Sequence, residues 1–126
     1  MRFLKIFTLF WMGGMIYGGM ELAWRGRTHW SMVLLGGLCF LLLGQIRLLA
    51  LPMGGRCVLG ALTVTGLELL CGLLVNRSYQ VWDYRRMPLN FLGQICLPFT
   101  VIWAAISLVA FFLYDRLDRW LEQMMY

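Results

Sequence analysis

Four long apolar stretches alternate with short polar segments along the chain. A helix of about 20 apolar residues crosses the hydrocarbon core of a bilayer, and each stretch approaches that length. The pattern predicts membrane-spanning helices at residues 6–24, 32–51, 57–75 and 91–114. We therefore expect an all-α fold, a single polytopic domain over residues 1–126 that forms a four-transmembrane-helix bundle.

The last segment, residues 115–126, has a different pattern. Apolar side chains recur there at helical spacing while charged side chains fill the opposite face; the apolar positions are Leu117, Trp120, Leu121, Met124 and Met125. This pattern is typical of an amphipathic helix that lies on a membrane surface or against a partner. We expect a C-terminal amphipathic helix at the interface.

Composition agrees with a membrane location. The chain is 61% apolar and only 13% charged, whereas a small soluble domain needs more charge to cover its surface. The net charge is +5, and the cations cluster between the apolar stretches, as in loops at lipid headgroups. The lipid bilayer is therefore the expected partner, and no nucleic acid is expected because no basic face on a soluble fold is indicated.

The distribution of cations leaves the orientation open. With the N-terminus inside, the inner side would carry Arg2, Lys5, Arg47, Arg56, Arg116 and Arg119, and the outer side Arg25, Arg27, Arg77, Arg85 and Arg86. A difference of six against five decides nothing under the positive-inside rule. Insertion in both orientations remains an alternative.

One carboxylate lies deep inside the third apolar stretch. Counting 1.5 Å per residue, Glu68 is about 10 Å of helix rise from Val75 and about 16 Å from Cys57. Placing a carboxylate near the bilayer centre costs roughly 2.5–3.5 kcal/mol on insertion scales. Because something must offset that cost, we predict a polar site around Glu68, with Thr65 and Gly72 on the same helix face. Gly72 is also expected to serve helix packing.

A second polar face occurs in the first stretch. Gly14 and Gly18 form a G-x-x-x-G pair that lets another helix approach closely. Tyr17 and Glu21 continue this face. Two interpretations of Glu21 remain open: an interfacial carboxylate paired locally with Arg25, or a residue that lines a polar path.

The fourth stretch carries its polar residues near its start. Gln94 and Pro98 lie one turn apart there, and proline in a membrane helix predicts a kink that faces a partner helix or a cavity. We assign Gln94, with Tyr17 and Thr65, to the predicted polar site.

The segment before this stretch is aromatic and basic. Its candidate interfacial residues are Trp82, Asp83, Tyr84, Arg85, Arg86 and Asn90. Aromatic rings suit the headgroup level, and arginines suit phosphates. Two interpretations stay open: a well-anchored interfacial loop, or a lid over a polar path.

The same region carries a family resemblance. The motif residues are Glu68, Gly72, Asn76, Trp82-Asp83-Tyr84, Pro88, Asn90, Gly93-Gln94-Ile95-Cys96-Leu97-Pro98 and Trp103. With Glu21-Leu22 in the first half, they resemble the putative ABC-transporter type IV (CmpB-like) membrane protein family in its short bacterial form. Many relatives have serine where this chain has Arg85. The resemblance implies a multi-pass protein of the bacterial cytoplasmic (inner) membrane, labelled a permease.

Two functions fit these observations. In the first, the chain is a transporter- or channel-type permease component that handles a proton, an ion or a small solute at Glu68. In the second, it is a structural or accessory membrane protein whose buried polar residues only lock helices together. A homo-oligomer, dimer or higher, is expected because four short helices rarely enclose a path, and a partner membrane protein remains open.

We expect no enzyme, metal site or cofactor. The sequence offers no nucleophile beside a base and no spacing of metal ligands. Its four cysteines form no C-x-x-C pair, so they read as buried free thiols.

Overall fold

The computed structural model describes residues 2–26, 29–77, 79 and 82–125. Its elements within these residues, in chain order, are α1 (Arg2–Arg25), α2 (Trp30–Ile46), α3 (Met53–Val75), β1 (Asn90–Phe91), β2 (Ile95–Cys96) and α4 (Leu97–Met125). Helices α1, α3 and α4 are long and apolar enough to cross a membrane, while α2 is an apolar helix of 17 residues. The predominantly helical fold is confirmed, and the fourth crossing remains a prediction.

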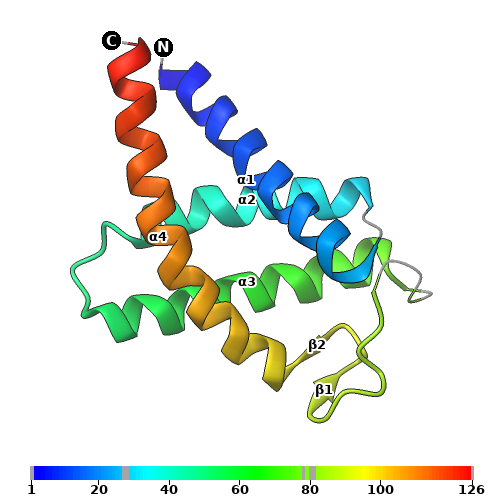
Figure 1. Cartoon of the computed structure of the whole chain (residues 1–126). Coiled ribbons are helices and arrows are strands. Elements are labelled where there is room, and N and C mark those ends of the chain that lie inside the picture. The colour runs from blue at the N-terminus through cyan, green and yellow to red at the C-terminus, as the bar shows by residue number, and fades with distance from the viewer. Residues whose placement is uncertain (1, 27–28, 78, 80–81, 126) are drawn as a thin grey trace.

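Helices α1 and α2 pack closely, as do α3 and α4, and the two chain termini lie side by side (Figure 1). Glycines permit the approach of α1 to α2. A Cβ at Gly14 would lie 2.5 Å from the Val33 carbonyl oxygen, and one at Gly37 would lie 2.6 Å from the Phe10 carbonyl oxygen. The Gly14 face, including Gly18, is therefore covered by α2 of the same chain. The buried core is apolar and draws on all four helices; its members include Leu9, Phe40, Leu43, Val64, Trp103 and Phe111.

Helix α2 ends earlier than expected, at Ile46 rather than at residue 51. The next residue, Arg47, donates from Nη1 to the Gly44 carbonyl oxygen, and its guanidinium lies 4.6 Å from the centroid of the Tyr114 ring on α4. The Arg47 side chain thus contacts α4 at the point where α2 ends. Helix α3 begins at Met53 rather than at residue 57, and Pro52 occupies its N-cap, a position whose N–H takes no part in the hydrogen bonds of the helix.

Helix α4 begins at Leu97, so the expected start at residue 91 was wrong. Strands β1 and β2 pair antiparallel before it, with Phe91 opposite Ile95. Leu92 and Gly93 have φ values of 55° and 68°, a conformation that makes a tight turn and excludes a right-handed helix. Pro98 falls in the first turn of α4, where proline breaks no hydrogen bond of the helix. Pro98 therefore gives no reason for the kink that its position in the sequence predicted.

The expected amphipathic tail is not a separate element, because α4 continues unbroken to Met125. Its charged residues contact the beginning of α1 and the end of α2. Lys5 Nζ lies 2.9 Å from Asp118 Oδ1, and Arg47 lies 3.5 Å from Asp118 and 3.5 Å from Asp115. Ion pairs between helices therefore hold the end of α4 beside the N-terminus.

Candidate functional site

Glu68 is buried between α3, α4 and the loop that joins them, with 2% of its surface exposed. The Tyr84 hydroxyl donates to its Oε2 at 3.1 Å, and Trp103 Nε1 donates to its Oε1 at 3.3 Å. Both carboxyl oxygens thus accept a hydrogen bond from an aromatic side chain. Helix α3 directs this acid inward, away from the surface that lipid or solvent would cover.

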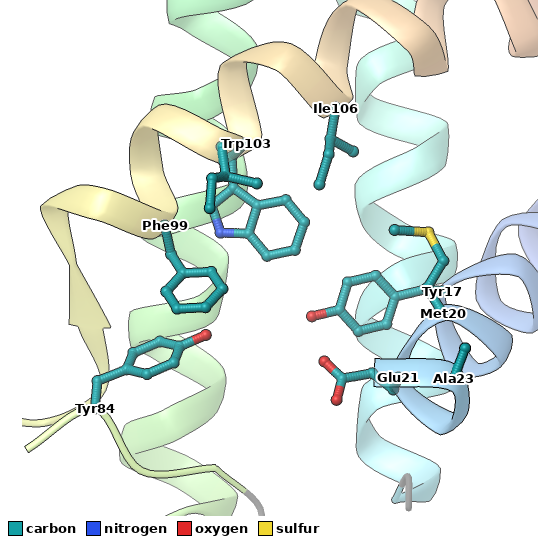
Figure 2. Close-up of a pocket in the computed structure, with 9 residues that line it drawn as sticks. Tyr17, Met20, Glu21, Ala23, Tyr84, Phe99, Trp103 and Ile106 are labelled. Atoms are coloured by element: carbon teal, nitrogen blue, oxygen red, sulfur yellow. The ribbon is translucent and has the colours of Figure 1, made fainter. Parts of the chain in front are cut away.

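A cavity of about 500 Å³ lies beside this acid, between α1 and α4. Its lining comes from α1, α4 and the α3–α4 loop: Tyr17, Met20, Glu21, Ala23, Tyr84, Phe99, Ile102, Trp103 and Ile106. Figure 2 shows the Tyr17 and Tyr84 hydroxyls pointing toward the middle of the cavity from opposite sides, with the Glu21 carboxylate near Tyr17. Glu21 is the charged residue among those that line it.

Aromatic stacking builds two walls of the cavity. The Tyr17 and Trp103 rings are 5.8 Å apart and inclined by 20°, and the Tyr84 and Phe99 rings are 5.0 Å apart and inclined by 14°. Tyr84 therefore contacts both the cavity and Glu68. Burial, followed by the nearby Glu68 carboxyl, raises the pKa of the Tyr84 hydroxyl, so this group stays a hydrogen-bond donor at neutral pH.

A smaller cavity of about 110 Å³ adjoins the larger one. It shares Tyr17, Trp103 and Ile106 with the larger one and reaches Ser107. Ser107 is fully buried, and its Oγ has no hydrogen-bond partner within the part of the chain that the structure describes.

Gln94 lies in a separate buried hydrogen-bond cluster, which we call the amide staple and define as Asn76, Trp82 and Gln94. Asn76 Nδ2 donates to the Trp82 carbonyl oxygen at 2.7 Å and to Gln94 Oε1 at 2.9 Å, and Trp82 N donates to Asn76 Oδ1 at 3.2 Å. Gln94 Nε2 donates to the Asn76 carbonyl oxygen at 3.0 Å, and Trp82 Nε1 donates to the Gln94 carbonyl oxygen at 2.9 Å. The staple joins the end of α3 to the hairpin before α4.

Gly72 makes room for the amide staple. A Cβ at this position would lie 2.3 Å from Gln94 Oε1. Thr65 makes a different contact: its Oγ1 donates to Thr100 Oγ1 at 3.0 Å, and Thr100 in turn donates to the Cys96 carbonyl oxygen.

The remaining loop residues lie toward the outside. Asp83 accepts from the Arg85 backbone and guanidinium, and these hydrogen bonds lower the pKa of its carboxyl to about 2. Arg85 also lies 4.1 Å over the Tyr79 ring, and Asn90 Nδ2 donates to the Met87 carbonyl oxygen at 2.9 Å. Arg86 is exposed. The exposed residues are thus Asp83, Arg85, Arg86 and Asn90, whereas Trp82 is buried and Tyr84 half-buried.

The residues assigned to one polar site therefore occupy four places, of which the Thr65–Thr100 contact is one. Tyr17 and Glu21 line the cavity, Glu68 lies behind it, and Gln94 belongs to the amide staple. The suggested local pair of Glu21 with Arg25 concerns a side chain outside the described part of the structure.

Three residues that build these places were not assigned to a site from the sequence, although two of them, Asn76 and Trp103, belong to the family motif. Phe99 and Trp103 are four residues apart and share a face of α4, a spacing that was visible in the sequence. Asn76 follows α3 directly, where a side-chain amide can bond backbone groups that the helix leaves unpaired. Their partners come from distant segments, which no local pattern indicates.

Metal coordination has no candidate among residues 2–26, 29–77, 79 and 82–125. These contain no group of three or more His, Cys, Asp or Glu side chains placed to hold an ion. The four cysteines are free thiols.

Comparison with known proteins gives one match. The family described as "Putative ABC-transporter type IV" matches residues 6–125, nearly the whole chain. No curated protein and no solved structure matches the chain.

Proposed function

The chain belongs to the putative ABC-transporter type IV family, and from that premise we propose that it is a transporter component whose polar centre is Glu68. The observation that carries the proposal is a fully buried carboxylate, held by Tyr84 and Trp103, directly behind an open cavity that the same two residues line. Ionisable groups inside membrane helices mark pathways for ions and protons by default.

The contacts at the helix ends support four membrane crossings. Lys5 at the start of α1 and Arg47 after α2 both pair with Asp118 near the end of α4, and Arg56 in α3 donates to the Arg47 carbonyl oxygen at 2.8 Å. The starts of α1 and α3 therefore lie at one end of the bundle, so α2 has to return across it. Its 17 residues span about 25 Å, which thinning of the bilayer can accommodate.

Glu68 is placed to exchange a proton or to respond to a cation. The Tyr84 ring faces the cavity while its hydroxyl bonds the carboxylate. A cation that enters the cavity and shifts Tyr84 would therefore change the hydrogen bonding and the proton affinity of Glu68. A second copy of the chain would complete the path, because one copy leaves the cavity open between α1 and α4.

The test compares two substitutions in proteoliposomes. In Glu68→Gln, the amide oxygen can accept from Trp103 while the Tyr84 hydroxyl turns to accept from the amide NH₂, so both hydrogen bonds survive without the charge. We expect Glu68→Gln to abolish proton or cation flux, measured with an internal pH-sensitive dye or a labelled ion, while the protein stays folded. Glu122→Gln, at an exposed glutamate near the end of α4, is the matched control and should transport normally. Unchanged flux in Glu68→Gln would refute the assignment.

The second candidate function, a structural protein, is favoured by the same two hydrogen bonds, because the Trp103 bond locks α3 to α4 and the Tyr84 bond locks α3 to the loop between them. It predicts that Glu68→Gln is harmless and that Glu68→Leu, which removes both acceptors from buried donors, destabilises the fold. The transport proposal instead predicts that flux is lost in both variants, whereas stability is lost only in Glu68→Leu.

A further inference from the structure

We propose that the cavity between α1 and α4 binds a lipophilic organic cation, with its charged group against the aromatic walls and Glu21. This inference rests on the proposed transport function and names the class of substrate. It is argued from the walls, the charge and the opening of the cavity.

The walls present aromatic rings from two sides. The stacked pairs Tyr17–Trp103 and Tyr84–Phe99 both line the cavity. Aromatic faces attract cations, and sets of such rings recognise quaternary ammonium groups in particular. A volume of about 500 Å³ suits an organic molecule rather than a bare ion.

The charge of the lining selects the sign of the ligand. Within the part of the chain that the structure describes, Glu21 is the charged residue lining the cavity and no lysine or arginine lines it, while the Glu68 carboxylate lies directly behind Tyr84 and Trp103. An inorganic cation would need several oxygen ligands, whereas the lining is mainly hydrocarbon and aromatic. An organic cation carries its own apolar surface and fits this lining.

The opening lies at the outer surface of the bundle. Met20 and Ile102 line the cavity and are 46% and 47% exposed, so its rim reaches the outer surface between α1 and α4. The smaller cavity, which shares Tyr17 and Trp103 with it, lies beside this space and is also lined mainly by apolar side chains. A cation with an apolar body can therefore enter from the membrane and leave that body among the helices.

The experiment uses two probes of equal shape and opposite charge. Equilibrium dialysis of the purified full chain in detergent would measure binding of tetraphenylphosphonium and of tetraphenylborate. We expect saturable binding of tetraphenylphosphonium alone, weakened about tenfold in Glu21→Gln because the Coulomb attraction between the carboxylate and the cation is lost. Phe99→Leu, which removes a ring face without removing a charge, should weaken it severalfold.

Glu122→Gln removes the same charge at the other end of the bundle and should bind like the unmodified chain. Absence of saturable binding, equal binding of the borate, or undiminished affinity in Glu21→Gln would each overturn the inference. Binding as expected combined with normal flux in Glu68→Gln would refute the transport assignment alone. Lost flux in Glu68→Gln without phosphonium binding would refute the ligand class alone.

Discussion

Replacing Asn76 with alanine should release the α3–α4 loop from the end of α3. The Asn76 side chain makes three hydrogen bonds of the amide staple, to the Trp82 carbonyl oxygen, the Trp82 backbone N–H and Gln94 Oε1. Asn76 is 0% exposed, Trp82 1% and Gln94 2%, so alanine would leave three buried polar groups without these partners.

The magnitude follows from the cost of such groups. Each buried donor or acceptor left unsatisfied costs about 1–3 kcal/mol. Water can enter the space that the amide vacates, so we expect the lower end of the range for each group. The free energy of unfolding should therefore fall by about 3 kcal/mol. Asn76→Asp should be no milder than alanine, although aspartate has the same shape, because it replaces the Nδ2 donor with an oxygen that faces two acceptors.

Two measurements check this prediction. Reversible unfolding in mixed detergent micelles gives the change in stability, and hydrogen exchange at the Trp82 and Gln94 amides reports the loop directly. Asn90→Ala is the matched control, because Asn90 also bonds loop carbonyls but is exposed, so its loss should cost less than about 1 kcal/mol. Equal effects of the two substitutions would refute the reasoning that burial makes the staple strong.

Two further predictions concern Gly72 and Asp83. Gly72→Ala should destabilise the protein by about 1–3 kcal/mol through overpacking, because the new Cβ would lie 2.3 Å from Gln94 Oε1. Gly66→Ala is the control: no atom lies within 4 Å of its new Cβ, so it should be neutral or stabilise by up to about 1 kcal/mol in the same unfolding assay. The Asp83 carboxyl should titrate at about pH 2 by ¹³C NMR and return toward its usual 3.8 in Arg85→Ala. Because its pKa is lowered in the folded state, its stabilising contribution is complete above the unfolded value and is lost as pH falls toward 2; an unchanged titration in Arg85→Ala would exclude the ion pair as the cause.

The helices were predictable because their signal is local. Long apolar stretches bounded by arginine, glycine and proline identify them without any knowledge of tertiary contacts. Their ends were not predictable in the same way. Arg47 ends α2 while bound to Tyr114 on α4, and the turn at Leu92 and Gly93 depends on positive φ angles that the apolar pattern does not reveal.

The burial of Glu68 was predictable from the cost of a carboxylate in lipid, but its partners were not. Tyr84 and Trp103 are 16 and 35 residues away along the chain. The position of Gln94 in the sequence suggested the same site as Glu68, but its side chain bonds Asn76 in the structure. A buried amide satisfies both donor and acceptor groups, and Gln94 does so with Asn76 in the amide staple.

Under the proposed function, the two roles considered from the sequence, transport and helix locking, would belong to different residues of one structure. Asn76 and Gln94 are neutral and bonded to backbone groups, so their contacts suit a structural role. Tyr84 follows Trp82 by two residues, so we expect the staple to help hold Tyr84 beside Glu68. Loss of the staple should therefore impair transport indirectly, through displacement of Tyr84, whereas Glu68→Gln should impair it with the loop intact. Hydrogen exchange of the α3–α4 loop, measured in Asn76→Ala and in Glu68→Gln, distinguishes these routes, because only Asn76→Ala should make the exchange faster.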